Sequence, residues 1–429
     1  MAERTPLERT SISRLSVYSV ITGALTGVGV AALNWSVIFT ERIVFGVDHL
    51  HNQDPTSAVS PLRHSLTLIA LGLVLSWAWF LLDRFGKPQV SVPDAMHGRT
   101  MPLLATSASA FIQVMSVAAG APVGRENAPR ILGGLAGSRI SARSKLDSAS
   151  RRILVAAAAG AGLGATFHLP LAGAIFALEL LLVSMSTQAV IAVMLTSATA
   201  TAVTGIFVEP HPVYHSVPVT ESSTTLIIAV AVGAIAGLAG HLFGKAARSA
   251  VKSRAIGRQV LWQMPLGFAA LALMSYLVPG VGTNARFTTD SVLTSQDAAA
   301  GLLLIGALRV LAILIAFRVG VVGGTLTPAF GLGAISGALI GVLLHPLFPA
   351  IPYGVFAVLG AAAFLSTAMA APMFGMIAAI EFTDMAAQGY LPVFVAVCAA
   401  ALAVRLWGLF THDERKLVPF TSALFTSKG

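Results

Sequence analysis

The sequence Gly124-Arg125-Glu126-Asn127-Ala128-Pro129 lies between two long apolar blocks and places a carboxylate beside membrane-length sequence. A carboxylate at membrane depth is energetically costly, and residues of this kind usually take part in ion or proton handling. Two interpretations are open from this motif alone. Glu126 either faces an ion pathway, or it lies in an interfacial loop or simply pairs with Arg125. The rest of the chain decides between them.

The composition indicates the class of protein. The chain has 429 residues, of which 56% are hydrophobic and 10% are charged. A soluble protein carries roughly 25% charged residues, so the deficit and the long apolar runs predict a polytopic helical membrane protein. The polar segment 1–14 leads into an apolar run without a small-residue cleavage site, so we expect an uncleaved first transmembrane helix. The net charge of +9 then reflects basic cytoplasmic loops and an attraction for anions, and no nucleic-acid partner is predicted.

The sequence argues against an enzyme. Its single cysteine, Cys398, excludes an intrachain disulfide and disfavours a cysteine metal site. We find no His, Asp, Glu or Cys cluster with catalytic or metal-ligand spacing. The prediction is therefore a protein without enzymatic activity, metal or cofactor.

The distribution of Lys and Arg between loops predicts the orientation. Basic loops face the cytoplasm, and the basic segments are the N-terminus, 84–99, 139–152, 245–258 and the tail. The loops with few basic residues are 48–63, 209–221 and 279–297. We therefore expect a multi-pass protein of the cell (inner) membrane with both termini cytoplasmic. Thr100–Ser138 must then enter and leave on the same side, and Glu126 lies within that excursion.

Two pairs of segments match each other. Pro170–Glu179 (PLAGAIFALE) and Pro372–Glu381 (PMFGMIAAIE) share the spacing from proline to glycine and from proline to glutamate. Upstream, Gly124–Pro129 is matched by Gly323–Pro328 (GGTLTP) in the same order. This order predicts a structural duplication.

The predicted organisation follows from the duplication: a cytoplasmic segment at 1–14, a first membrane repeat at 15–222, a second at 223–412 and a short cytoplasmic tail at 413–429. Repeats of this kind place an ion site near the midplane, where broken helices meet. A helix N-terminus at such a site carries partial positive charge and free N–H groups. The pattern therefore favours an anion pathway.

The sequence resembles the CLC family of chloride channels and anion/proton antiporters. Gly124–Ala128 resembles the family's G-R-E-G-P motif, and Gly324–Pro328 resembles its G-x-F-x-P motif. The most specific match is Gly160–Gly173, a small-residue helix followed by a P-L-A-G turn. The resemblance implies an all-α integral membrane fold, an inverted-repeat bundle of about eighteen tilted, partly broken helices. It also implies a homodimer with one pore per subunit.

The resemblance assigns roles to residues. Glu126 corresponds to the gate and proton carrier. The implied anion-binding set is Val90, Ser91, Gly124, Arg125, Asn127, Thr325, Leu326, Thr327 and Phe420. Five positions depart from the family pattern. Asn127 stands where the gating motif usually has glycine, and Leu326 stands where phenylalanine is usual. The other three depart from the chloride-type pattern. Val90 stands at the central serine unless Ser91 shifts into its place, Leu180 at the internal proton relay, and Phe420 where an inner tyrosine is usual.

The implied function is transport of a small inorganic anion, a chloride-type halide, in exchange for protons and gated by Glu126. Two alternatives stay open. The fluoride/proton antiporter branch also lacks the internal glutamate and the central serine, and has a threonine near the Thr327 position. A passive anion channel would equally tolerate the missing glutamate. A carrier of organic solutes is disfavoured, because glycine-rich, backbone-lined sites suit small ions.

Overall fold

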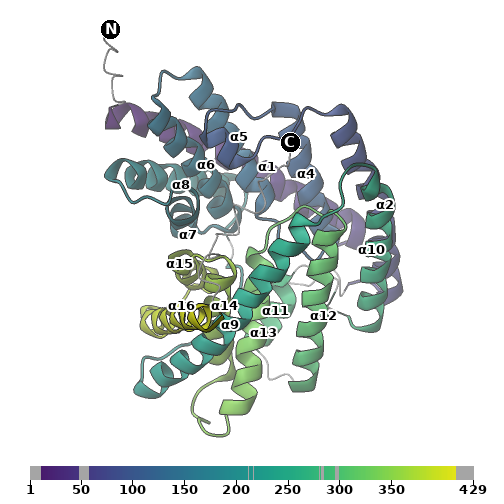
Figure 1. The fold of residues 1–429 in the computed structure, drawn as a ribbon, viewed down its shortest axis with the longest axis vertical. Coiled ribbons are helices and arrows are strands. Elements are labelled where there is room, and N and C mark those ends of the chain that lie inside the picture. The colour runs from purple at the N-terminus through teal and green to yellow at the C-terminus, as the bar shows by residue number, and fades with distance from the viewer. Residues whose placement is uncertain are drawn as a thin grey trace. The chain divides into compact units, whose positions relative to one another are not determined.

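The computed structural model describes residues 11–47, 58–210, 212–215, 217–279, 281, 285–294 and 299–411. These residues form sixteen α-helices and no β-strand (Figure 1). Eight helices are long and apolar enough to cross a membrane: α1 (Ile12–Phe45), α2 (Pro61–Phe85), α8 (Thr187–Phe207), α9 (Ser223–Lys252), α10 (Val260–Leu277), α12 (Ala299–Arg318), α13 (Leu326–Leu344) and α16 (Tyr390–Thr411). The predicted all-α membrane fold is confirmed.

The other helices are shorter or less apolar: α3 (Val92–Met96), α4 (Leu103–Ala118), α5 (Asn127–Arg143), α6 (Ser148–Phe167), α7 (Pro170–Phe176), α11 (Ala285–Thr294), α14 (Tyr353–Ala368) and α15 (Pro372–Phe382). Helix α14 has 16 residues, a length of about 24 Å, whereas the hydrocarbon core is about 30 Å thick. Since every residue from Gly354 to Ala368 is buried, α14 is an internal helix that other helices cover.

The chain forms two compact units, each assembled from separate segments. Unit 1 consists of Met1–Asn34, Lys87–Ala110 and Pro129–Pro210. Unit 2 consists of Trp35–Gly86, Phe111–Ala128 and His211–Gly429. The predicted repeats at 15–222 and 223–412 are linear stretches of sequence, and their boundaries stay a prediction.

Helices α6 and α14 end in the same way. Just after each helix one residue takes a left-handed conformation, His168 with φ 56° and Ala370 with φ 53°. The N–H of the next residue then bonds to the carbonyl five residues earlier, at 2.8 and 2.9 Å respectively, which satisfies a carbonyl at the helix end. A proline begins the following helix, Pro170 in α7 and Pro372 in α15. The matching sequence segments therefore share one local structure.

Helices α4 and α12 end with a second shared structure. Gly120 follows α4 with φ 112°, and Gly320 follows α12 with φ 100°. In both turns the next N–H again bonds to the carbonyl five residues earlier, at 3.0 Å. Glycine suits these positions because a left-handed backbone is strained for residues with a Cβ. Each turn leads directly into one of the two glycine motifs.

Small residues set the packing in unit 1. All residues of α6 from Ile153 to Phe167 are buried. A Cβ on Gly162 would overlap the Pro129 carbonyl at the start of α5, and one on Gly133 would overlap the Ala158 carbonyl of α6. Helix backbones approach this closely only where side chains are absent, as in many membrane helix pairs.

In unit 2, helices α9, α13, α14 and α16 pack together (Figure 1). Helix α13 crosses α14 where Gly337 faces Gly360, and α9 lies against α16 where Gly233 faces Ala396. The Thr367 hydroxyl of α14 donates to the carbonyl of Gly237 in α9 at 2.7 Å. These contacts pack α13 against α14, α14 against α9, and α9 against α16.

Helices α2 and α10 form an antiparallel pair in the same unit. The Ser65 hydroxyl donates to the Ala272 carbonyl at 3.0 Å. Farther along α2, Gly72 faces the Phe268 side chain. The contacts run in opposite directions along the two helices, so the C-terminal end of α2 lies beside the start of α10.

Candidate functional site

The two glycine motifs of unit 2 pair through their backbones. The N–H of Gly124 donates to the Gly324 carbonyl at 2.9 Å, and the N–H of Gly324 donates to the Gly124 carbonyl at 2.8 Å. This is one antiparallel bridge between the loops that precede α5 and α13. The bridge brings together segments about two hundred positions apart in the sequence.

The Glu126 carboxylate occupies the N-terminus of α13. Its Oε1 accepts a hydrogen bond from the backbone N–H of Leu326 at 2.6 Å. Glu126 is 4% exposed and Leu326 is fully buried. The first N–H groups of a helix have no partner within the helix and carry partial positive charge. Glu126 thus places a carboxylate at a position suited to binding a free anion.

Glycine is required at both bridge positions because of this carboxylate. A Cβ on Gly324 would overlap the Oε1 of Glu126, and a Cβ on Gly124 would overlap Oε2. Neither glycine has a positive φ, so the requirement is for space and not for an unusual backbone conformation. The two glycines form a cradle for the side chain of Glu126.

A buried amide pair holds the start of α5. Asn127 Nδ2 donates to Gln113 Oε1 of α4 at 2.6 Å, and the two residues are 8% and 2% exposed. This bond fixes the residue next to Glu126. Gln113 was not among the predicted site residues, and its only signal is a polar residue within an apolar segment.

The remaining predicted residues of the second motif lie around the same helix end. Thr325 is buried, and its hydroxyl donates to the sulfur of Met369 at 3.3 Å. Thr327 lies on the first turn of α13 and is partly buried. Arg125, from the first motif, precedes Glu126 in the sequence and is also partly buried. Met369 is a second contact that the sequence did not indicate.

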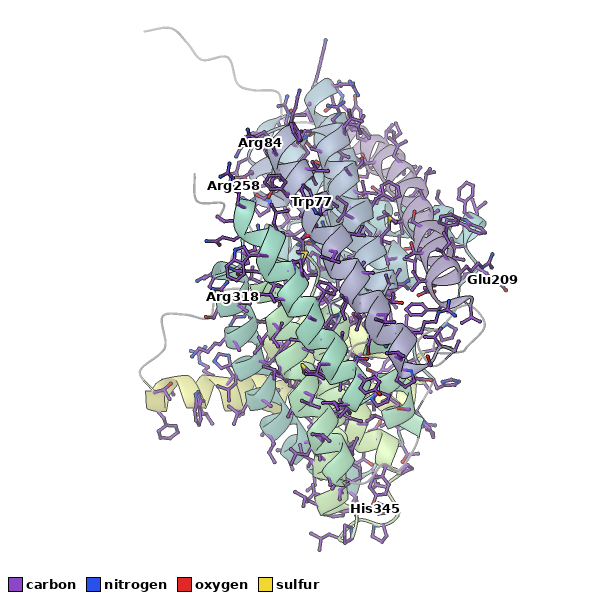
Figure 2. All side chains as sticks on the ribbon, turned by 90° about the vertical axis from the view of Figure 1, so that its right-hand side faces the viewer. Trp77, Arg84, Glu209, Arg258, Arg318 and His345 are labelled. Atoms are coloured by element: carbon purple, nitrogen blue, oxygen red, sulfur yellow. The ribbon has the colours of Figure 1, made fainter. Side chains whose placement is uncertain are left out.

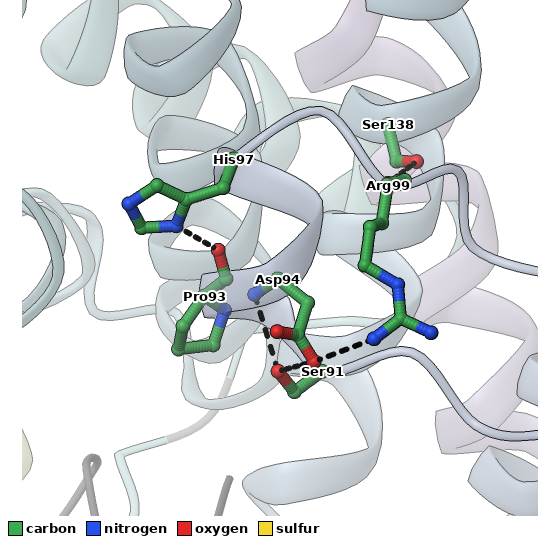
Figure 3. Close-up of polar contacts among 6 residues, drawn as sticks. All are labelled: Ser91, Pro93, Asp94, His97, Arg99 and Ser138. Atoms are coloured by element: carbon green, nitrogen blue, oxygen red, sulfur yellow. Dashed lines mark hydrogen bonds and ion pairs between the residues drawn. The ribbon is translucent and has the colours of Figure 1, made fainter. Parts of the chain in front are cut away.

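Val90 and Ser91 belong to unit 1. The Ser91 hydroxyl caps α3 by accepting the N–H of Asp94 at 3.2 Å and donates to Asp94 Oδ2 at 2.8 Å (Figure 3). The same carboxylate pairs with Arg99 at 3.5 Å. The structure thus gives Ser91 a capping contact, and Val90 is partly buried. Their part in anion binding stays a prediction, and Phe420 lies outside the described residues.

The segment after the P-L-A-G turn is wound more loosely than an α-helix. Residues Ala177–Leu182 form a π-helical turn that continues α7. Glu179 is partly buried and Leu180 is 5% exposed. Leu180, at the position expected to relay internal protons, is therefore a buried apolar side chain. Among the described residues no group of three or more His, Cys, Asp or Glu side chains could hold a metal ion.

This architecture defines a class. A bundle of apolar helices with repeated breaks holds a carboxylate at a helix N-terminus, as expected of a membrane protein that transports small anions. The model of the voltage gated chloride channel family matches residues 66–405, and the chain belongs to this family, the CLC family. The predicted family and the multi-pass membrane class are confirmed.

Relatives and solved structures agree with this assignment. The chain is 26% identical over 345 residues to the voltage-gated ClC-type chloride channel ClcB of Escherichia coli O17:K52:H18 (strain UMN026 / ExPEC), covering 78% of this chain and 82% of that protein. It is similar to the structure of a slow cyanobacterial Cl⁻/H⁺ antiporter, with a TM-score of 0.80 and 20% identity over 99% of this chain and 98% of that one. A CLC-type fluoride/proton antiporter gives a TM-score of 0.68 and 22% identity, over 93% and 96%. The structural similarities establish the fold.

Proposed function

We propose that the chain exchanges a chloride-type halide for protons, with Glu126 as both the gate and the proton carrier. The observation that carries this proposal is the hydrogen bond from Leu326 N–H to the Glu126 carboxylate. The Glu126 carboxylate is an anion of the protein itself, and it occupies the N-terminus of α13. A transported anion could bind the same N–H group at the same positive helix end.

The mechanism follows from the charge of the carboxylate. When ionised, Glu126 accepts a charge-assisted hydrogen bond, which contributes about 1.5–3 kcal/mol, whereas a neutral bond contributes about 0.5–1.5 kcal/mol. Protonation therefore weakens its hold on α13, and the side chain leaves the cradle with its proton. The free anion then takes the N–H of Leu326, and return of the ionised carboxylate displaces that anion again.

The surrounding groups keep the loop fixed while the side chain moves. The bridge between Gly124 and Gly324 holds the backbone, and the Asn127–Gln113 bond holds the next residue. Only the Glu126 side chain then needs to rotate. Because Leu180 cannot carry a proton, internal protons reach Glu126 by a route that does not use this position.

Transport in sealed liposomes tests the proposal. Reversal potentials measured with and without a proton gradient reveal coupling, and Glu126→Gln is expected to abolish proton flux and pH dependence while anion flux persists. Glu209→Gln is the matched control, since Glu209 is exposed in a loop (Figure 2). Retention of proton flux in Glu126→Gln refutes the assigned role. Absence of coupling in the native protein indicates the passive channel instead.

Fluoride/proton exchange is the second candidate. Val90 favours it, because the side chain at the expected central serine position carries no hydroxyl donor. Anion coordination there would rely on backbone N–H groups. A panel of chloride, fluoride and nitrate in the same liposomes separates the two candidates by the anion that drives proton movement.

The assembly and orientation belong to the same proposal. We propose a homodimer in the inner membrane with both termini cytoplasmic, supported by the family resemblance and by the basic loops. Cross-linking in native membranes tests the dimer. Reporter fusions at each terminus test the orientation, and a periplasmic signal at either end contradicts it.

A further inference from the structure

Unit 2 gathers positive charge where several of its helices begin or end. Arg84 lies in the last turn of α2, Arg258 lies in the short turn η3 (Gly257–Gln259) before α10, and Arg318 ends α12. The N–H of Ala255, in the link between α9 and α10, donates to the Arg318 carbonyl at 2.9 Å. In Figure 2 the labels of Arg84, Arg258 and Arg318 follow one another down the left of the view, with Arg318 lowest, and Trp77 lies to the right of Arg258. We call Arg84, Arg258 and Arg318 the arginine cluster.

The guanidinium groups of this cluster are available to a ligand. All three residues are exposed. The side chains of Arg84 and Arg258 form no hydrogen bond or ion pair with any residue in the described part of the chain. Arg318 Nη1 donates to Gln263 Oε1 at 3.3 Å, which keeps its side chain beside α10.

One carboxylate, Asp83, lies in the last turn of α2 beside the cluster. Burial lowers the pKa of Arg254, and the charge of Asp83 acts in the opposite direction. The single negative charge of Asp83 is outweighed by the three arginines together with Arg254. The arginine cluster keeps an uncompensated positive charge, and guanidinium groups match phosphate oxygens in geometry and charge.

Two exposed tryptophans mark the depth of the cluster relative to a membrane. Trp77 is 57% exposed on α2 and Trp262 is 58% exposed on α10. Trp77 precedes Arg84 by seven residues, about 10 Å along the helix, and Trp262 follows Arg258 by four residues, about 6 Å. Tryptophan favours the boundary between headgroups and acyl chains. Arg84 and Arg258 thus lie at headgroup level, and the guanidinium of Arg318, bonded to Gln263, lies beside Trp262 at the boundary.

Apolar side chains lie on the membrane side of the arginines on both helices. Leu81 precedes Arg84 on α2 and Leu266 follows Trp262 on α10, and they are 46% and 63% exposed. In a membrane protein such a surface faces acyl chains, and it runs directly up to the arginines because α2 and α10 are antiparallel. A phospholipid has this same arrangement, with a phosphate at one end and apolar chains below.

We propose that the arginine cluster binds the headgroup of an anionic phospholipid whose acyl chains lie along the exposed faces of α2 and α10. Clusters of Lys and Arg at the cytoplasmic ends of membrane helices attract anionic lipids, with about 1 kcal/mol per residue near the surface. A second basic surface of the chain, around Arg143 and Lys145, lacks the aromatic residues that accompany the arginine cluster. Between Asn127 and Thr166, which includes Arg143 and Lys145, no aromatic residue occurs.

A lipid bound to the arginine cluster would also affect the proposed transport site at the start of α13. Arg318 precedes Leu326 by eight residues, and the intervening loop contains the Gly324 bridge. A lipid that holds Arg318 therefore steadies the segment that presents the Leu326 N–H. This consequence rests on the proposed function, whereas lipid binding itself does not.

Native mass spectrometry of the full chain in detergent tests the site. Phosphatidylglycerol is titrated against phosphatidylcholine, and Arg84→Gln/Arg258→Gln is expected to weaken phosphatidylglycerol binding about tenfold or more, without changing phosphatidylcholine binding. The matched control is Arg143→Gln/Lys145→Gln, which also removes two exposed cations and is expected to bind like the native chain. Elution and thermal unfolding without lipid confirm that each variant folds.

Three results overturn the proposal. The first is an equal loss of binding in both double variants, which indicates a general effect of surface charge. The second is displacement of phosphatidylglycerol by millimolar inorganic phosphate, which indicates a phosphate site without lipid specificity. The third is unchanged binding in Arg84→Gln/Arg258→Gln. Because the assay counts bound lipids and measures no transport, failure of the transport proposal leaves its outcome unaffected.

Discussion

Replacing Gly324 with alanine tests the cradle directly. The added Cβ would overlap Glu126 Oε1, so the carboxylate cannot keep its bond to Leu326 N–H. The backbone of Gly324 has no positive φ, which means that alanine introduces no backbone strain. The substitution therefore acts on the side chain of Glu126 alone.

The magnitude follows from the lost bond. A hydrogen bond to a charged group contributes about 1.5–3 kcal/mol, and each 1.4 kcal/mol is about a tenfold change in an equilibrium. We expect the balance between the seated and released carboxylate to shift by about 10- to 150-fold towards release. Under the proposed function the ionised carboxylate closes the site at alkaline pH, so anion flux at alkaline pH should rise and its pH dependence should flatten.

Flux of chloride and of fluoride from liposomes across a pH series measures this effect. Gly301→Ala is the matched control, because a Cβ at Gly301 in α12 meets no atom within 4 Å. In the combination with Glu126→Gln, Gly324→Ala should add little, since both changes remove the same contact. A native pH profile in Gly324→Ala, or full additivity in the double variant, would refute the reasoning.

Three further predictions concern individual contacts. Gln113→Leu leaves the Asn127 amide without its buried acceptor and should destabilise the protein by about 1–3 kcal/mol, as measured by thermal unfolding in detergent. Adding Asn127→Leu to this variant should recover part of the lost stability. A native melting curve for Gln113→Leu alone would contradict the prediction. Ala370→Gly should stabilise by about 1 kcal/mol, because Ala370 has φ 53°. Ala368→Gly, at the end of α14, should instead destabilise, and the same sign for both substitutions would argue against left-handed strain. Ser91→Ala removes the cap of α3 and should cost about 1 kcal/mol of stability; a change in anion preference without loss of stability would instead support the predicted anion-binding role.

The positions of the helix breaks could be predicted from the sequence. Gly120, Gly320, Pro170 and Pro372 mark them, because glycine permits a left-handed turn and proline cannot continue a helix. Such effects act within a few residues, so they leave a trace in the local sequence. His168 and Ala370 take the left-handed turns themselves; histidine is enriched in this conformation, whereas alanine gave no such signal.

The contacts of the candidate site could be predicted only in part. The carboxylate of Glu126 stood out because an acidic residue is rare in apolar sequence. Its partner is a backbone N–H, a group that every residue except proline carries, so no residue letter identifies Leu326 as the donor. The family resemblance suggested that segment, and the structure supplied the bond. Gln113 and Met369 were missed because their importance lies in contacts with distant residues.

The sequence by itself determined the class of protein, the family and the repeated motifs, and it singled out the carboxylate that we propose as the gate. These depend on composition, on local spacing and on the energetic rarity of a carboxylate beside apolar helices. Only the tertiary structure decided that Gly124 and Gly324 pair, that they form the cradle around Glu126, and that the cradle lies at the start of α13. The physical reason is that this site is made by backbone groups and by missing side chains, which acquire a function only when folding brings the two motifs together.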